Sequence, residues 1–279
     1  MTGAAVVSRR AGVLGSPVAH SLSPVLHRAA YQALGLTGWT YDAYDVGTAD
    51  LPGFLDRLDD SWAGLSLTMP LKAAVLPLLD SASPLVDAVG AANTVLLSGG
   101  RRSGDNTDVP GMVAALAERG VAPVSSMAVL GGGATARSAL AAAVSLAGTV
   151  SVYSRTEQRA GALVATAGAV GIDMDVRRWE EATEALDAPL VVNTTPAGAA
   201  DRLAHDLPST VGTLFEIVYH PWPTPLAAAW AQRGGVVVDG LDLLVHQAVL
   251  QVALMTGAEV DIPVLADLLR TAGRQALST

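Results

Sequence analysis

The stretch MAVLGGGATARSALAAA, residues 127–143, decides the fold that we expect for this chain. An apolar strand over residues 127–130 is followed at once by three glycines and then by an alanine-rich helix. Glycines let the backbone approach a pyrophosphate closely, and the N-terminus of the next helix favours its negative charge. The pattern therefore predicts the strand, loop and helix that open a dinucleotide-binding domain.

The next predicted strand, residues 149–153, ends in Ser154, Arg155 and Thr156, and Arg159 follows one helical turn later. Domains that bind NAD usually carry an acidic residue at this strand end, which binds the ribose 2′-hydroxyl. Arginine in its place favours a 2′-phosphate and therefore NADP(H). The alternative is a pair of solvated arginines at the start of a helix.

A second stretch, GLSLTMPLK at residues 64–72, contains the only lysine, because the other sixteen formal positive charges are arginines. Alternating apolar residues predict a strand over residues 65–68, and Thr68 and Pro70 suit the start of a helix. Lys72 would then lie in the first helical turn, where the helix dipole disfavours a cation. Lysine, unlike arginine, can be brought to transfer a proton near neutral pH. We therefore expect Lys72 to act in proton transfer, with a solvated surface lysine as the alternative.

Composition narrows the classes of protein to which the chain can belong. With 51% hydrophobic and 15% charged residues, 279 residues can build one large domain or two ordinary ones. The longest apolar runs are far shorter than the ~20 residues of a membrane span, and the N-terminus lacks the pattern of a secretion signal. The absence of cysteine excludes disulfides and thiolate metal sites. We expect a soluble, cytoplasmic protein with no membrane partner.

The charge pattern limits the possible partners further. The net charge is −9 and no basic stripe is present, which argues against nucleic acid as a partner. The five histidines show no metal-ligand spacing, so we expect no metal. An anionic ligand must then be held by a few arginines, hydroxyls and backbone amides.

The N-terminal part of the chain predicts a further α/β layer. Strands over residues 11–15 and 40–46 are separated by a helix, which implies a parallel sheet. Ser21 and Ser23 lie on the loop at the carboxyl end of the first strand, where open α/β sheets bind ligands. Two close hydroxyls can bind a carboxylate, although Ser23 can equally serve as the N-cap of the next helix, with Pro24 at its first position.

Two polar groups later in the chain remain ambiguous on pattern alone. The loop over residues 105–108, DNTD, is either a ligand-binding loop or an Asx turn with helix capping. Gln247 and Gln251 share one face of an otherwise apolar helix, so each is either a substrate contact or a satisfied core group.

Taken together, the motifs of this chain resemble the shikimate dehydrogenase family. The resemblance runs in order through GSPVAHSLSP, SLTMPLK, GAANTV, GDNTDVPG, GGGATAR, SRTEQR, NTTPAG, YHPWPTPL and GLDLLVHQ. It implies an α/β fold with a substrate-binding catalytic domain over residues 1–108 and 242–279 and an NADP-binding Rossmann domain over residues 109–241. C-terminal helices would return to the first domain. The implied reaction is the reversible NADPH-dependent reduction of 3-dehydroshikimate to shikimate in the biosynthesis of chorismate and the aromatic amino acids.

The resemblance also implies a role for individual residues. Lys72 and Asp108 would form the catalytic pair. Ser21 and Ser23 would hold the substrate carboxylate, and the remaining substrate contacts would be Ser66, Thr68, Asn93, Tyr219 and Gln247. The cofactor contacts would be Gly131, Gly132, Gly133, Ala134, Thr135, Ala136, Ser154, Arg155, Thr156, Arg159, Thr194, Thr195, Pro196, Val218, Gly240 and Leu243.

Three positions depart from the pattern of the family. Ser66 and Ser154 stand where asparagine is common, and Leu243 replaces a common methionine, which puts fine affinity and substrate preference in doubt. A close alternative is an enzyme that oxidises quinate or uses NAD. Ser23 argues against quinate as the substrate, and Arg155 argues against NAD as the cofactor. A non-catalytic NADP-binding paralogue stays open, and a methylenetetrahydrofolate-type dehydrogenase leaves the paired serines and the DNTD loop unexplained. The chain is expected to be a monomer or a homodimer.

Overall fold

The computed structural model describes residues 8–278, apart from the side chains of residues 157 and 158. The chain forms two compact units. Unit 1 combines Met1–Asp87, Ala91–Thr107 and Gln247–Thr279, and unit 2 combines Ala88–Gly90 with Asp108–His246.

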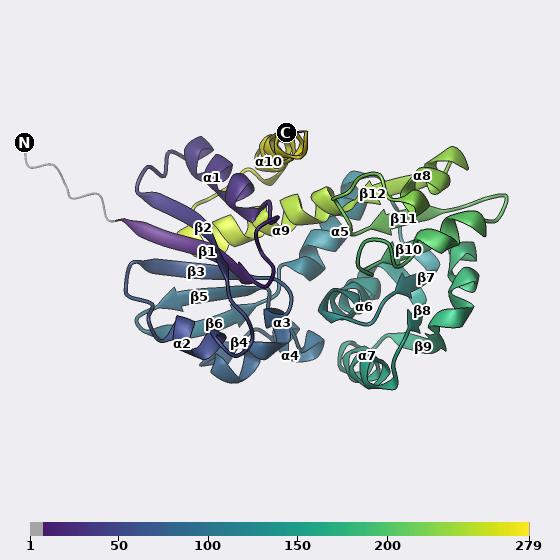
Figure 1. The fold of residues 1–279 in the computed structure, drawn as a ribbon, viewed down its shortest axis with the longest axis horizontal. Helices are drawn as coiled ribbons and strands as arrows, with labels where there is room; N and C mark the ends of the chain where they lie inside the picture. The colour runs from purple at the N-terminus through teal and green to yellow at the C-terminus, as the bar shows by residue number, and fades with distance from the viewer. Residues whose placement is uncertain (1–7, 279) are drawn as a thin grey trace, which may run out of the picture. The chain divides into compact units, whose positions relative to one another are not determined.

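Unit 1 is built on a mixed six-stranded sheet (Figure 1). Its strands are β1 (Arg9–Gly15), β2 (Trp39–Asp45), β3 (Trp62–Leu67), β4 (Ser81–Ala82), β5 (Thr94–Ser98) and β6 (Arg101–Asp105), in the order β2-β1-β3-β5-β6-β4. The prediction of a parallel sheet holds for β1 with its neighbours β2 and β3, but β5 is antiparallel to both β3 and β6. The reason is the hairpin between β5 and β6, because a connection of only Gly99 and Gly100, with φ of 56° and 73°, can join only antiparallel strands.

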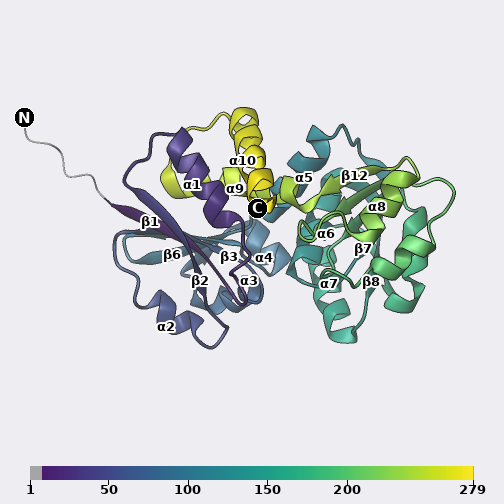
Figure 2. The ribbon, with the colours of Figure 1, turned by 45° about the horizontal axis from the view of Figure 1, so that its top comes forward.

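Helices cover both faces of this sheet. They are α1 (Ser23–Ala33), α2 (Leu51–Leu55), α3 (Leu71–Ala74), the 3-10 turn η1 (Leu76–Leu78), the first part of α4 (Pro84–Val89), α9 (Gly240–Thr256) from Gln247 onward, and α10 (Ile262–Leu277). α1 and α10 pack against each other on one face, and α2 and α3 lie on the other (Figures 1 and 2). The central strand β3 is buried along its whole length, as a strand covered on both faces must be.

Unit 2 is built on an all-parallel sheet. Its strands are β7 (Val124–Leu130), β8 (Ala147–Ser154), β9 (Asp173–Arg178), β10 (Leu190–Asn193), β11 (Thr213–Glu216) and β12 (Val236–Asp239), in the order β12-β11-β10-β7-β8-β9. This is the doubly wound order of dinucleotide-binding folds, with its switch point between β7 and β10. Ligands of such sheets bind at the carboxyl ends of the strands beside that point.

The helices of unit 2 include α5 (Asp108–Glu118), α6 (Ala134–Leu146), α7 (Glu157–Val170), η2 (Trp179–Asp187), η3 (Asp201–His205) and α8 (Pro225–Gln232). α6 packs against both α5 and α7, while η2, η3 and α8 bury Trp179, Leu203 and Trp230 in one core cluster. The α/β architecture with a Rossmann sheet and C-terminal helices that return to the N-terminal layer is therefore confirmed.

Candidate active site

One edge of the unit 1 sheet gathers most of the predicted substrate residues. Backbone hydrogen bonds join the segments that follow β1 and β3, from Thr68 N to Leu14 O at 2.9 Å and from Ser16 N to Met69 O at 3.0 Å. Ala92 N donates to Lys72 O at 2.8 Å, which fixes the residue before Asn93 beside Lys72. The loops that carry the predicted contacts are thus joined to one another through the backbone.

Ser21 and Ser23 lie where the sequence predicts them, but their local roles differ from the capping prediction. α1 begins at Ser23, the N-cap is Leu22, and no side chain caps this helix. Ser21 Oγ accepts a hydrogen bond from Ser23 N at 3.3 Å. The interpretation of Ser23 as an N-cap is therefore wrong, and its buried hydroxyl is not used in capping.

Lys72 lies in a helix that is shorter than predicted. α3 spans four residues, and its N-cap position is Pro70, with no side-chain cap from Thr68. Lys72 is the second residue of this helix, as predicted, but the helix-dipole argument does not apply, because a single turn aligns too few peptide dipoles. The lysine is half-buried.

Asn93 is the centre of a buried polar cluster. Its Oδ1 accepts from Thr107 N at 2.8 Å and from Thr94 Oγ1 at 2.9 Å. Its Nδ2 donates to Thr107 Oγ1 at 2.9 Å and to Gln247 Oε1 at 3.4 Å. Asn93 is 2% exposed and Gln247 is 6% exposed, so these two predicted ring contacts hold each other in place.

The structure adds two side chains to this edge that the sequence did not identify as site residues. Gln251, one helical turn after Gln247, binds Ser66, Thr94 and the backbone of Asn93. Tyr41 donates to Ser66 Oγ at 2.6 Å. The spacing of the two glutamines was a signal for Gln251, whereas nothing in the local sequence marked Tyr41.

Asp108 is the first residue of α5 in unit 2 and is buried. A carboxylate in the first turn of a helix is stabilised by the exposed backbone amides there. The DNTD segment is tied down by Asn106 Nδ2, which donates to Ala91 O at 2.9 Å.

The glycine loop of unit 2 follows β7 as predicted. Gly131 has φ of +118°, and a Cβ there would lie 2.4 Å from Thr194 Oγ1. A Cβ on Gly132 would lie 2.7 Å from Ser154 Oγ, whereas Gly133 has open space. Within the described part of the chain, the buried Ser154 Oγ has no hydrogen-bond partner. A backbone kept bare by glycine, a helix N-terminus and an unsatisfied hydroxyl fit a dinucleotide phosphate group.

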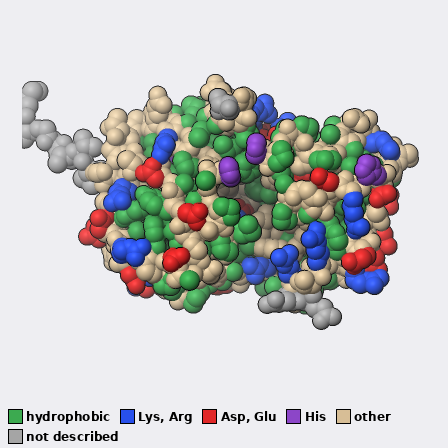
Figure 3. Space-filling view, in the orientation of Figure 1, with side chains coloured by type: hydrophobic (Ala, Val, Ile, Leu, Met, Phe, Trp, Pro, Cys, Tyr) green, Lys and Arg blue, Asp and Glu red, His purple; other side chains and the backbone are tan. Residues whose placement is uncertain are grey.

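Positive charge gathers beside this loop. Arg155 and Arg159 are exposed at the end of β8 and in the first turn of α7, and Figure 3 shows basic side chains over this region. The Arg155 guanidinium lies 5.0 Å from the centre of the Trp179 ring, a cation–π contact. Neither arginine forms an ion pair with any described residue, in contrast to Arg177, which pairs with Asp175 at 2.8 Å.

A buried carboxyl group organises the neighbouring loops of unit 2. Glu216 is 0% exposed and accepts from Asn193 Nδ2 at 3.0 and 2.9 Å, from Thr224 Oγ1 at 3.1 Å and from Val218 N at 3.3 Å. Burial raises the pKa of Glu216. Asn193 Oδ1 in turn accepts from Thr195 N at 3.1 Å. Glu216, which the sequence analysis missed, thus fixes the loops that carry Thr194, Thr195, Pro196 and Val218.

The remaining predicted residues of unit 2 lie around the start of α9. A Cβ on Gly240 would lie 1.9 Å from Ile217 O, so only glycine allows this close approach. Asp242 is fully buried and pairs with Arg119 at 2.7 Å, which fixes the turn that carries the buried Leu243. Tyr219 is partly exposed after β11.

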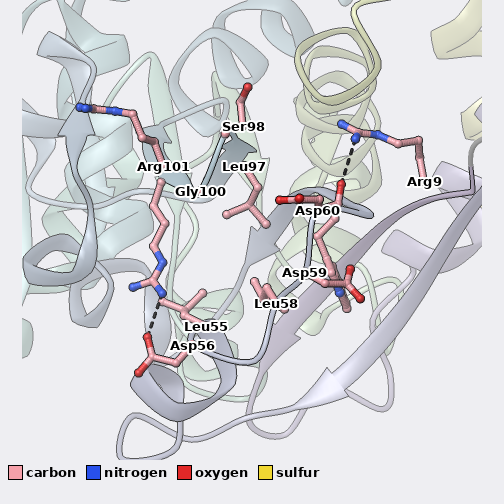
Figure 4. Close-up of a pocket in the computed structure, with 13 residues that line it drawn as sticks. Arg9, Leu55, Asp56, Leu58, Asp59, Asp60, Leu97, Ser98, Gly100 and Arg101 are labelled. Atoms are coloured by element: carbon pink, nitrogen blue, oxygen red, sulfur yellow. Dashed lines mark hydrogen bonds and ion pairs between the residues drawn. The ribbon is translucent and has the colours of Figure 1, made fainter.

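A pocket of about 410 Å³ lies at the opposite end of the unit 1 strands and contains none of the predicted residues (Figure 4). Arg9 and Trp62, at the starts of β1 and β3, line it together with the β5–β6 turn. Its charges are largely satisfied internally, since Arg102 pairs with Asp56 at 2.9 Å and Arg9 donates to a backbone carbonyl.

No group of three or more metal-ligating side chains occurs among residues 8–278. None of the helices in that range is long and apolar enough to cross a membrane.

Comparison with known proteins identifies the family. Residues 13–95 match the shikimate dehydrogenase substrate binding domain. The chain is 40% identical over 253 residues to a shikimate dehydrogenase (NADP(+)) of Thermus thermophilus, an alignment that covers 89% of this chain and 92% of the relative. The crystal structure of Mycobacterium tuberculosis shikimate dehydrogenase matches with a TM-score of 0.85 and 38% identity, over 94% of this chain and 99% of that one.

A further solved structure is a shikimate 5-dehydrogenase from a second strain of Thermus thermophilus, in complex with NADP(H) and shikimate. It matches with a TM-score of 0.81 and 36% identity, over 95% of this chain and 99% of that one. The fold, the polar cluster around Asn93 in unit 1 and the glycine loop with its arginines in unit 2 define the class: a two-unit α/β protein with a dinucleotide-binding sheet. The chain belongs to the shikimate dehydrogenase family, which confirms the resemblance drawn from its motifs.

Proposed function

We propose that this chain is a shikimate dehydrogenase that interconverts 3-dehydroshikimate and shikimate with NADP(H). The observation that carries the proposal is the gathering of Lys72, Ser21, Thr68, Asn93 and Gln247 at one edge of the unit 1 sheet. A small acid with several ring hydroxyls needs such a set of neutral donors and acceptors beside one titratable group. The Thermus thermophilus relative, 40% identical, is a shikimate dehydrogenase (NADP(+)), which supports the same substrate and cofactor.

In this proposal NADP(H) binds to unit 2. Arg155 and Arg159 would bind its 2′-phosphate, and their lack of acidic partners among the described residues supports NADP(H) over NAD. The glycine loop and the start of α6 would hold the pyrophosphate, and further contacts would come from Thr156, Thr194, Thr195, Pro196, Val218, Gly240 and Leu243. When bound, this cofactor supplies or accepts a hydride at a ring carbon of the substrate.

The residues of this chain bind the substrate and move its proton. Ser21 and Ser23 bind the carboxylate, and the ring oxygens are bound by Ser66, Thr68, Asn93, Tyr219 and Gln247. In reduction, the Lys72 ammonium gives a proton to the substrate oxygen, and in oxidation the uncharged amine takes the hydroxyl proton. Asp108 orients the hydroxyl and the ammonium. General acid–base catalysis of this kind typically contributes ~10²–10⁴-fold to the rate.

The division of the chain follows from these roles. We assign residues 1–108 and 242–279 to the substrate-binding catalytic domain and residues 109–241 to the NADP-binding domain. We place the enzyme in the cytoplasm, as a monomer or homodimer, with the absence of cysteine in support of a reducing compartment.

The experiment is an initial-rate assay of the purified protein that follows the absorbance of the reduced cofactor. Shikimate and quinate are each combined with NADP⁺ and NAD⁺. We expect turnover mainly with shikimate and NADP⁺. A comparable rate with quinate or NAD⁺ would contradict the assigned specificity, and NADPH binding without turnover in any combination would favour a non-catalytic paralogue.

A further inference from the structure

A buried hydrogen-bond chain in unit 1 connects residues that lie far apart in the sequence. The Tyr41 hydroxyl on β2 donates to Ser66 Oγ on β3 at 2.6 Å, and Ser66 Oγ donates to Gln251 Oε1 on α9 at 2.7 Å. Tyr41 and Gln251 are 0% exposed and Ser66 is 4% exposed. Unpaired polar groups are costly at such depth, so each of these bonds constrains its members strongly.

A backbone carbonyl sets the donor-to-acceptor direction of these hydrogen bonds. Gln251 Nε2 donates to the carbonyl oxygen of Asn93 at 3.1 Å, and a carbonyl can only accept. The amide nitrogen of Gln251 must therefore face Asn93, which turns its Oε1 towards Ser66. Gln251 Nε2 also donates to Thr94 Oγ1 at 2.9 Å, which directs the Thr94 hydroxyl proton to Asn93 Oδ1. One glutamine thus orients both the serine hydroxyl and the side chain of Asn93.

The other end of the chain lies beside the segment that carries Ser23. Ser23 is 5% exposed, and its carbonyl oxygen lies 2.9 Å from Nδ1 of His27. The Tyr41 ring is held flat against the His27 ring, with the ring centres 3.9 Å apart and an interplanar angle of 17°. The phenol group therefore has little freedom to move, and it connects Ser66 through the His27 ring to the turn that begins at Ser23.

We propose that Tyr41 and Gln251 are positioning residues for shikimate, which act through Ser23, Ser66 and Asn93. This inference rests on the proposed function. Tyr41 donates to Ser66 and stacks on His27, which is held to the backbone of Ser23, and Gln251 orients Ser66 and Asn93. Ser66, which departs from the common asparagine, is thus coupled to Tyr41 by a direct hydrogen bond.

The test is the substitution Tyr41→Phe, which removes one hydroxyl and keeps the ring. We expect the KM for shikimate to rise about 3- to 10-fold, the effect of one lost hydrogen bond. The KM for NADP⁺ and the kcat should stay within about twofold, because the Tyr41 hydroxyl binds Ser66 and the residues assigned to the cofactor belong to unit 2. Gln251→Met should raise the KM for shikimate at least as much.

Tyr31→Phe is the matched control. Tyr31 belongs to the same aromatic group, with its ring centre 6.4 Å from that of Tyr41, and its buried hydroxyl has no hydrogen-bond partner among the described residues. Removal of that hydroxyl should leave both KM values unchanged. An unchanged KM for shikimate in Tyr41→Phe, or an equal rise in the KM values for shikimate and NADP⁺, would overturn the inference. Activity of the wild-type enzyme would still uphold the proposed function in that case. An inactive wild type would overturn the proposed function and this inference with it.

Discussion

Acidification should destabilise this protein through His27, which lies fully buried in α1 and stacked on Tyr41. Its Nδ1 is 2.9 Å from Ser23 O, and its buried Nε2 has no hydrogen-bond partner among the described residues. A second ring proton would therefore occupy a site with no acceptor. Desolvation by burial lowers the pKa of His27 to about 4 from the ordinary 6.5, although the bond to Ser23 opposes the shift.

The sign and size of the effect follow from linkage. Between pH 6.5 and pH 4 the unfolded chain binds a proton at this imidazole that the folded protein does not bind, so the free energy of unfolding falls as the pH falls. Each pKa unit corresponds to about 1.36 kcal/mol, so a pKa difference of about 2.5 corresponds to a total loss of about 3 kcal/mol, nearly complete at pH 4. Above pH 6.5 this histidine contributes no pH dependence.

Urea unfolding of wild type and His27→Phe at several pH values between 7 and 4 measures this contribution. Phenylalanine keeps a flat ring against Tyr41 but cannot titrate. The variant should lose about 3 kcal/mol less than wild type across the range, whereas His20→Gln, which removes an exposed imidazole, should follow wild type. Parallel curves for wild type and His27→Phe would refute the conclusion that His27 is buried and neutral.

Three further predictions concern unit 2. Arg155→Leu should raise the KM for NADP⁺ at least 10-fold with little effect on the use of NAD⁺, because one charge-assisted phosphate contact is lost. Steady-state kinetics with both cofactors measure this, with Arg177→Leu as the ion-paired control. If the role of Arg155 is wrong, Arg155→Leu will change the KM values for NADP⁺ and NAD⁺ equally. Glu216→Ala should lower the free energy of unfolding by about 2–4 kcal/mol, because Asn193 and its other donors lose their acceptor, whereas Glu216→Gln should be milder; chemical denaturation measures both, and equal losses would argue against a hydrogen-bond role. Gly131→Ala should abolish NADPH binding by calorimetry while Gly133→Ala, where space is open, should retain it, and the reverse order would contradict the role of the loop.

Local patterns allowed much of unit 2 to be predicted. The strand, glycine loop and helix around residues 127–143 depend on residues close in sequence, so their positions were found correctly. The end of β8 at Ser154 placed Arg155 beside the loop for the same reason. Glu216 was missed because it is a single acidic residue at the end of an apolar strand. Its structural role depends on hydrogen-bond donors that lie on other segments.

Unit 1 was harder because its arrangement depends on distant pairings. The antiparallel contact of β5 with β3 joins segments that are not adjacent in the sequence, and no short-range pattern encodes it. Lys72 was singled out for its rarity, and its role in proton transfer stays a prediction, because the helix expected to set its environment is a single turn. Tyr41 and Gln251 are 210 residues apart in sequence and meet only through Ser66, so their shared role could be inferred only from the structure.

The measurement that tests the central claim most directly is the turnover of shikimate with NADP⁺ by wild type and by Lys72→Ala, with NADP⁺ binding measured on both. The account predicts an active wild type and a kcat lower by at least ~10²-fold in the variant, with little change in the KM for shikimate and unchanged NADP⁺ binding. A variant that keeps its kcat, or that changes only in KM, would show that Lys72 does not carry the proton.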